Sequence, residues 1–442
     1  MKTVSNMDGV AAAVAPGTIP RLPGELTLDR LDNGLTVALV ANPQAPLVTV
    51  ATCYRAGSRD EAPGHGGTAH FLEHMMFKGS ARFGPGEVDR RTQALGGANN
   101  AFTTHDSTTY HFSFAADRWR TALEIESDRM AGLTLGPREV EAERRVILEE
   151  IAMYEDDPWD VLSQKVEKAF FDGHPYGRPV LGTREELLAT GRDELAAFHR
   201  ERYRPDTAVL VVAGDLEPER ALAHVAEAFG DLPSGGPARP EVPRGVRPAG
   251  VERIERRRGE MARLMIALPA PEALAASFPE ARLLATLIGS GRGSRLYRRL
   301  VDEGQLCVFA AAGLSEALDP TSLTLAAEVL PGVEPEVVEE AILALLADLV
   351  ERPPEPWEVE RARQVLLADW ALGHERISQQ ALALAGELAL FERGWTERTM
   401  EAMARLGPED VFRAARELLG PAVEGRRGAV IGWSLPSGGE EP

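Results

Sequence analysis

Cysteine is scarce in this chain of 442 residues, which has only Cys53 and Cys307, far apart in the sequence. Neither belongs to a C-x-x-C pair, so the sequence excludes both a disulfide framework and a thiolate zinc site. So few cysteines are typical of a protein that works in a reducing compartment.

Long apolar runs are also absent, since no stretch reaches the ~18–20 apolar residues that a membrane-spanning helix needs. Residues 1–24 form an N-terminal extension whose short Ala/Val run is broken by Pro16 and Gly17. This run is a poor signal peptide because its apolar region is weak and no clear cleavage site follows. We therefore expect a cytoplasmic protein with no membrane span.

Positive charge is in deficit: 48 Lys and Arg residues face 68 Asp and Glu residues, and the net charge is −20. Such an acidic surface argues against nucleic acid or an anionic membrane as the main partner. It is compatible with basic peptide substrates, although solubility is the simpler explanation of the charge.

The length of the chain exceeds the size at which one hydrophobic core stops growing, so we expect two domains. Residues 233–253 are rich in Pro and Gly and poor in large apolar residues, which is typical of a linker. We therefore place a zinc-binding first domain (argued below) at residues 25–232 and a second domain at residues 254–436.

The order of the predicted elements indicates an α+β fold. Asn33-Gly34 lies between two alternating runs and predicts a hairpin. The elements that follow in the first half are a strand at 48–57, a helix at 67–78, paired strands at 99–104 and 108–114, a helix at 138–171 broken near Pro158, and a buried strand at 207–216.

A similar order returns in the second half, with a strand at 262–268 and helices at 280–288, 336–350 and 357–372. This repetition indicates an internal duplication. We expect two homologous α/β-sandwich domains joined by the linker, each a sheet covered on one side by helices.

The sequence GTAHFLEHMMFKGS at residues 67–80 carries His70, Glu73 and His74 at i, i+3 and i+4, which share one face of a helix. Two imidazoles one turn apart can bind a single Zn²⁺, and the carboxylate beside them can accept the proton of a metal-bound water. Two His and one further carboxylate leave the fourth zinc position open, which is typical of a catalytic site. The motif alone also arises by chance in a chain of this length.

The third ligand must come from elsewhere, and the helix EAERRVILEEIAMYE offers five glutamates: Glu141, Glu143, Glu149, Glu150 and Glu155. Helical periodicity places Glu143 and Glu150 on or beside the apolar stripe of this helix, and Glu149 on the opposite side. A carboxylate on a buried stripe is costly unless it is paired or binds a metal. We therefore expect Glu150 to bind the metal and Glu143 to contact a metal ligand without binding the metal itself.

The stretches AHFLEHMMFKG and ERRVILEE resemble the pitrilysin/insulinase family of zinc peptidases, and in particular the subfamily typified by mitochondrial processing peptidase. LDNGLTVALV, GGANNAFTTHDSTTY, HPYGRPVLGT and VLVVAGDLEPE also resemble landmarks of that family, so the resemblance spans most of the chain. It implies one Zn²⁺ per chain, held by His70, His74 and Glu150, with Glu143 as a supporting acid.

The resemblance also implies a mechanism and a mode of substrate binding. Zinc would polarise the scissile carbonyl and activate a water whose proton passes to Glu73. The strand that contains Asn100, Ala101, Phe102 and Thr103 would pair with the backbone of an extended peptide. These properties predict an endopeptidase that hydrolyses short or unfolded peptides.

One departure from the family pattern concerns an Arg and a Tyr, seven residues apart, that reach the substrate in members able to act alone. Val301 and Val308 occupy those positions here, and neither side chain can donate a hydrogen bond. Heterodimeric members carry the zinc motif and this pair on different subunits, so we expect a homologous, zinc-less partner subunit, with a homodimer as the other arrangement. A catalytically silent scaffold subunit and a dedicated maturase of one peptide precursor stay as alternative functions.

Overall fold

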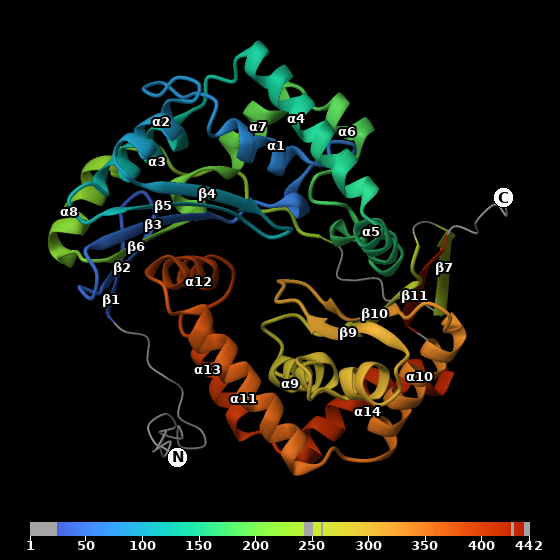
Figure 1. The fold of residues 1–442 in the computed structure, drawn as a ribbon. Coiled ribbons are helices and arrows are strands. Elements are labelled where there is room, and N and C mark those ends of the chain that lie inside the picture. Colours follow the sequence, from blue (N-terminus) through green and yellow to red (C-terminus); the bar gives the residue numbers. More distant parts are fainter. Residues whose placement is uncertain (1–23, 243–250, 258–259, 426–427, 437–442) are drawn as a thin grey trace, which may run out of the picture.

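The computed structural model describes residues 24–242, 251–257, 260–425 and 428–436, and its architecture is α+β as predicted. Two mixed sheets, one in each half of the chain, face each other across the middle of the molecule (Figure 1). Most helices lie on the outer sides of these sheets. No described helix is long and apolar enough to cross a membrane.

The first sheet has the strand order β1-β2-β6-β3-β5-β4, so β4 forms one of its edges. Its strands are β1 (Glu25–Arg30), β2 (Thr36–Ala41), β3 (Leu47–Tyr54), β4 (Ala98–Thr103), β5 (Thr108–Ala115) and β6 (Ala208–Gly214). The helices of this half are α1 (Thr68–Met75), α2 (Glu87–Ala94), α3 (Arg120–Ala131), α4 (Pro137–Asp156), α5 (Pro158–Phe170), α6 (Arg184–Ala189), α7 (Arg192–Arg202) and α8 (Pro218–Phe229).

The second sheet has the order β7-β11-β8-β10-β9. Its strands are β7 (Val251–Arg257), β8 (Arg263–Ala270), β9 (Cys307–Leu314), β10 (Thr321–Val329) and β11 (Ala429–Leu435). The helices of this half are α9 (Phe278–Gly289), α10 (Pro335–Glu351), α11 (Pro356–Gly373), α12 (Ile377–Leu390), α13 (Trp395–Arg405) and α14 (Pro408–Gly425).

The two halves share one topology when β1 is set aside. Strands β2, β6, β3, β5 and β4 correspond in order to β7, β11, β8, β10 and β9. The first pair of each series is parallel, and every later pair is antiparallel. The prediction of two homologous α/β domains is therefore confirmed.

Each half also sends one helix onto the inner face of the other half's sheet (Figure 1). Helix α12 lies on the first sheet, where Ala381, Ala385 and Ala389 pack against small residues of β2, β3 and β6. Helix α5 lies on the second sheet, where Leu162 and Val166 pack against β8 and β11. Helices thus cover part of both faces of each sheet, not one face alone, and the exchange joins the two halves through buried apolar surface.

Several predicted boundaries can be compared with the observed elements. The Asn33-Gly34 hairpin is confirmed, because β1 and β2 pair antiparallel on either side of it. The predicted long helix is broken as expected: α4 ends at Asp156, and Asp157 caps α5 by accepting a hydrogen bond from the Trp159 N–H (2.7 Å). Strand β7 begins at Val251, inside the stretch that we predicted as linker.

Ala385→Leu should destabilise the fold, because this fully buried side chain lies between α12 and the first sheet. Overpacking of that kind costs ~1–3 kcal/mol. Urea unfolding measures the effect, and Ala383→Leu at an exposed position of the same helix is the matched control. Equal midpoints for the two variants would show that α12 is not fixed against the first sheet.

Candidate metal centre

Helix α1, which carries the H-x-x-E-H motif, is held at its N-terminus by a buried glutamate. The Glu61 carboxylate accepts hydrogen bonds from the backbone N–H groups of Gly67 (3.1 Å) and Ala69 (2.8 Å). A helix leaves its first N–H groups without intrahelical partners, and a carboxylate there is favourable. Glu61 thereby fixes the point at which α1 begins.

The loop after the HPYG turn packs directly on the same end of α1. Gly67 has φ +84°, and a Cβ there would lie 2.2 Å from the carbonyl oxygen of Leu181. A Cβ on Gly182, whose φ is +71°, would lie 2.3 Å from the carbonyl oxygen of Gly66. Only glycine permits backbones to approach so closely in this conformation. The loop at residues 179–185 therefore lies close enough to α1 to line the same cavity as His70, Glu73 and His74.

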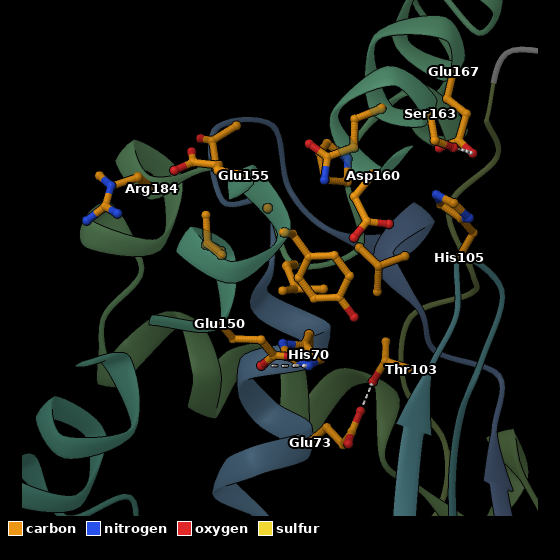
Figure 2. A pocket seen from close by; sticks show the side chains of 18 of the residues that line it. His70, Glu73, Thr103, His105, Glu150, Glu155, Asp160, Ser163, Glu167 and Arg184 are labelled. Carbon is orange, nitrogen blue, oxygen red and sulfur yellow. Dashed lines mark hydrogen bonds and ion pairs between the residues drawn. The ribbon is translucent and has the colours of Figure 1, made fainter. Parts of the chain in front are cut away.

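His70 and His74 of α1 converge with Glu150 of α4. Glu150 Oε2 lies 3.8 Å from His70 Nε2 and 3.7 Å from His74 Nε2, and Figure 2 shows Glu150 beside His70. Ligands held by one tetrahedral zinc ion at ~2.0–2.1 Å lie about 3.4 Å apart. The ligand atoms of the three side chains all lie within 4.8 Å of one another, so these residues could hold one zinc ion.

The protonation of His70 also suits a metal ligand. The side chain is 8% exposed, and burial together with the neighbouring His74 lowers the pKa of His70 to about 3. The imidazole is therefore neutral at physiological pH, which is the form that binds metals.

Glu143 lies behind His74, one of the two imidazoles. Its Oε2 is 3.1 Å from His74 Nδ1, and its Oε1 is 2.7 Å from Lys78 Nζ. Burial opposes ionisation of Glu143, but the hydrogen bonds from His74 and Lys78 outweigh it and lower the pKa of this carboxyl. A hydrogen bond at Nδ1 orients the ring so that Nε2 points toward Glu150 and the cavity.

Glu73 also lines the cavity and is held by the edge strand of the first sheet. Thr103 Oγ1 donates a hydrogen bond to Glu73 Oε2 (2.5 Å), as Figure 2 shows. Burial raises the pKa of Glu73, although the hydrogen bond from Thr103 and the charge of His74 oppose that shift. A carboxyl group with a raised pKa is suited to proton transfer near neutral pH.

The cavity around these groups has a volume of about 780 Å³ and lies between α1, α4, β4 and the loop at residues 179–185. Ala101, Phe102 and Thr103 of β4 line it, whereas Asn100 does not. Among the described strands β4 pairs only with β5, so its other edge has no neighbouring strand.

A buried polar cluster joins the β4–β5 turn to the second half of the chain. Arg59 forms ion pairs with Asp106 of this turn (3.0 Å) and with Asp319 of the β9–β10 turn (2.7 Å). Asp106 also accepts hydrogen bonds from the Tyr176 hydroxyl (2.7 Å) and the Leu318 N–H (3.1 Å). Removing one charge from such a cluster would leave another buried without its partner, which is costly. The position of β4 is therefore coupled to the second half.

Known proteins share both the sequence pattern and the fold of this chain. The family described as "Insulinase (Peptidase family M16)" matches residues 36–184, and "Peptidase M16 inactive domain" matches residues 190–366. The chain belongs to peptidase family M16. It is similar to an uncharacterized zinc protease of Mycobacterium leprae, with 31% identity over 398 residues that cover 88% of each chain.

This M16 chain is also similar to a eukaryotic peptidase subunit and to a bacterial protease of known structure. The beta subunit of the mitochondrial-processing peptidase of Lentinula edodes is 34% identical over 206 residues, which are 47% of this chain and 44% of that subunit. A protease from Helicobacter pylori has a similar fold, with a TM-score of 0.87 and 23% identity over 93% of this chain and 100% of that one.

Some features of this M16 site were not predicted from the sequence. Lys78 pairs with Glu143, Thr103 contacts Glu73, and Glu61 caps α1, yet no motif assigned these contacts. Lys78 follows the motif by one helical turn, and that spacing was a usable signal. The contacts of Thr103 and Glu61 depend on how separate elements come together.

Glu61→Gln should weaken both the fold and zinc binding. The amide retains one acceptor but turns an N–H donor toward a backbone N–H, which costs about 1–3 kcal/mol at a buried site. Urea unfolding and zinc titration against a chromogenic chelator measure the two effects. Glu87→Gln, at a carboxylate that accepts a hydrogen bond from the Gly84 N–H just before α2, should leave zinc affinity unchanged. Equal zinc affinities in both variants would contradict the role of Glu61.

Proposed function

We propose that this M16 chain is a zinc-dependent endopeptidase that hydrolyses short or unfolded peptides. The observation that carries the proposal is the convergence of His70, His74 and Glu150 in the cavity that also contains Glu73. A structural zinc site has four protein ligands, whereas three ligands beside an acid in an open cavity favour catalysis.

The residues divide the chemistry between them. Zinc held by His70, His74 and Glu150 would supply a Lewis acid for the scissile carbonyl and would lower the pKa of a bound water toward ~7. Glu73 accepts the proton of the attacking water and later gives it to the leaving amine. Thr103 holds the Glu73 carboxylate on the side of the substrate strand, and Glu143 keeps His74 oriented.

The substrate is an extended peptide that adds to the free edge of β4. Such pairing gives backbone hydrogen bonds without requiring particular side chains. Asn100, Ala101, Phe102 and Thr103 make up this substrate-binding segment of the edge. It leads to Glu73, because Thr103 contacts that carboxylate. A folded protein cannot present an extended backbone at this position, and unfolded peptides are the substrates that fit.

Full activity also requires a second, homologous subunit. The side chains around the site come from residues 70–185, so the described second half contributes none of them. Val301 and Val308 lie in the second half, on a short π-helix (Tyr297–Asp302) and on β9. Similarity to a subunit of mitochondrial-processing peptidase supports an arrangement in which a zinc-less partner supplies the missing Arg and Tyr.

Glu73→Gln should abolish peptide hydrolysis while zinc stays bound, because the amide cannot accept the proton. A loss of about 10²–10⁴-fold is expected for removal of a general base. Cleavage of quenched fluorescent peptides and zinc content by elemental analysis measure the two properties. Glu150→Gln should lose the metal, and Glu149→Gln, on the exposed side of α4, should behave like the unchanged chain. Hydrolysis that survives Glu73→Gln or complete zinc removal would refute the mechanism.

The partner hypothesis predicts that the purified chain cleaves peptides weakly alone and at least tenfold faster with a zinc-less homologue. The double variant Val301→Arg/Val308→Tyr should also gain activity if two copies associate, since each would supply the pair to the other. If the unchanged chain is fully active by itself and neither experiment raises its activity, the partner hypothesis is rejected. The proposal that the chain is a peptidase would still stand.

A further inference from the structure

A second cavity, of about 700 Å³, lies between the two halves of the chain. Its walls come from the β4–β5 turn, the β9–β10 turn and helices α11, α12 and α13. We name it the interlobe cavity. None of the residues discussed as metal ligands or as the general base lines it, so the reaction itself does not explain it.

The interlobe cavity lies next to the zinc cavity. Phe102, His105 and Glu167 line both of them. Phe102 belongs to the edge strand β4, and His105 follows it in the turn. A peptide that pairs with β4 beside the metal and continues past the end of that strand therefore enters the interlobe cavity.

Helices α11, α12 and α13 contribute several large apolar side chains to the wall of the second half. Leu366, Trp370, Leu390, Phe391 and Met400 line the cavity from α11, from α12 and its end, and from α13. Aromatic and Met side chains of this kind bind apolar groups of varied shape. The wall therefore suits a large apolar side chain.

The charged groups restrict the ligand further. Arg282, the only Lys or Arg among the described lining residues, pairs with Glu316. Glu167, Asp369 and Glu387 also line the cavity, and Glu387 accepts hydrogen bonds from the N–H groups of Gly394 and Thr396. An acidic segment would be repelled, so the ligand is neutral or basic apart from its apolar side chain.

We propose that the interlobe cavity is a distal subsite, which binds a large apolar side chain of the peptide substrate several residues away from the scissile bond. This proposal rests on the proposed peptidase function and adds a substrate class to it. The preferred substrates are unfolded peptides long enough to reach from the zinc to the second half. Short peptides occupy only the zinc cavity and gain nothing from the subsite.

Gly386 of α12 offers a way to fill the cavity without disturbing its walls. It lines the cavity, and a Cβ there would meet no atom within 4 Å. Replacing a glycine inside a helix also favours helix formation. Gly386→Trp should therefore fill the subsite in a folded protein, and Gly386→Leu provides a smaller plug. Ala368→Trp, exposed on α11 and outside both cavities, is the matched control.

The test compares three quenched peptides with the zinc-loaded full chain: a short peptide, a long peptide with a distal Phe, and the same long peptide with Ser instead. For the unchanged chain, the distal Phe should raise kcat/KM at least tenfold, mainly through KM, since burying such a side chain is worth that much. Gly386→Trp should remove this advantage, whereas Ala368→Trp should keep it. If the ratio of kcat/KM for the Phe peptide to kcat/KM for the Ser peptide is the same in Gly386→Trp as in the unchanged chain, the subsite is rejected.

Binding separates this inference from the proposed function. Fluorescence anisotropy measures how tightly the labelled Phe and Ser peptides bind zinc-loaded Glu73→Gln, with and without Gly386→Trp. Tighter binding of the Phe peptide that is lost in Gly386→Trp supports the subsite. This conclusion holds even if no variant hydrolyses any peptide and the peptidase proposal fails. Equal binding of both peptides by the unplugged protein overturns the subsite, whether or not hydrolysis is observed.

Discussion

The pairing of α1 with α4 is the contact on which the candidate metal centre depends. Two imidazoles of one helix meet two carboxylates of the other, and all four side chains are at least partly buried. Buried carboxylates are unfavourable without partners. Glu143 obtains them from His74 and Lys78, whereas Glu150 lies 3.7–3.8 Å from the two imidazoles, an arrangement that could hold a metal. The helices must therefore keep their relative position for the charges to be balanced.

The surrounding structure fixes that position from several sides. Glu61 holds the first N–H groups of α1, and the contact of Gly67 with the loop at Leu181 leaves no space for displacement. On the other side, the β4–β5 turn is attached through Asp106 and Arg59 to the second half. These contacts place β4 beside Glu73, so the acid and the edge strand share one cavity.

The duplication of the fold gives the two halves different tasks. Helix α9 follows β8 as α1 follows β3, but its sequence FPEARLLATLIG contains no His and packs into the core of its own half. The second half instead supplies α12 to the inner face of the first sheet and a wall of the interlobe cavity. One topology thus carries the candidate metal centre in one copy and supporting surfaces in the other.

The sequence by itself determined the features that follow from local periodicity. His70, Glu73 and His74 share a face because a helix repeats every 3.6 residues, and the same spacing placed Glu143 and Glu150, among five glutamates, on or beside the apolar stripe of the second helix. The hairpin at Asn33-Gly34 and the helix break before Pro158 also follow from local backbone preferences.

Contacts between distant segments were decided by the tertiary structure alone. The hydrogen bond from Thr103 to Glu73, the cap by Glu61, the exchange of α5 and α12, and the interlobe cavity all join elements that are separate in the sequence. Sequence periodicity shows which face of an element is buried, but not which other element covers it. That choice is made when the two sheets and their exchanged helices pack together as one molecule.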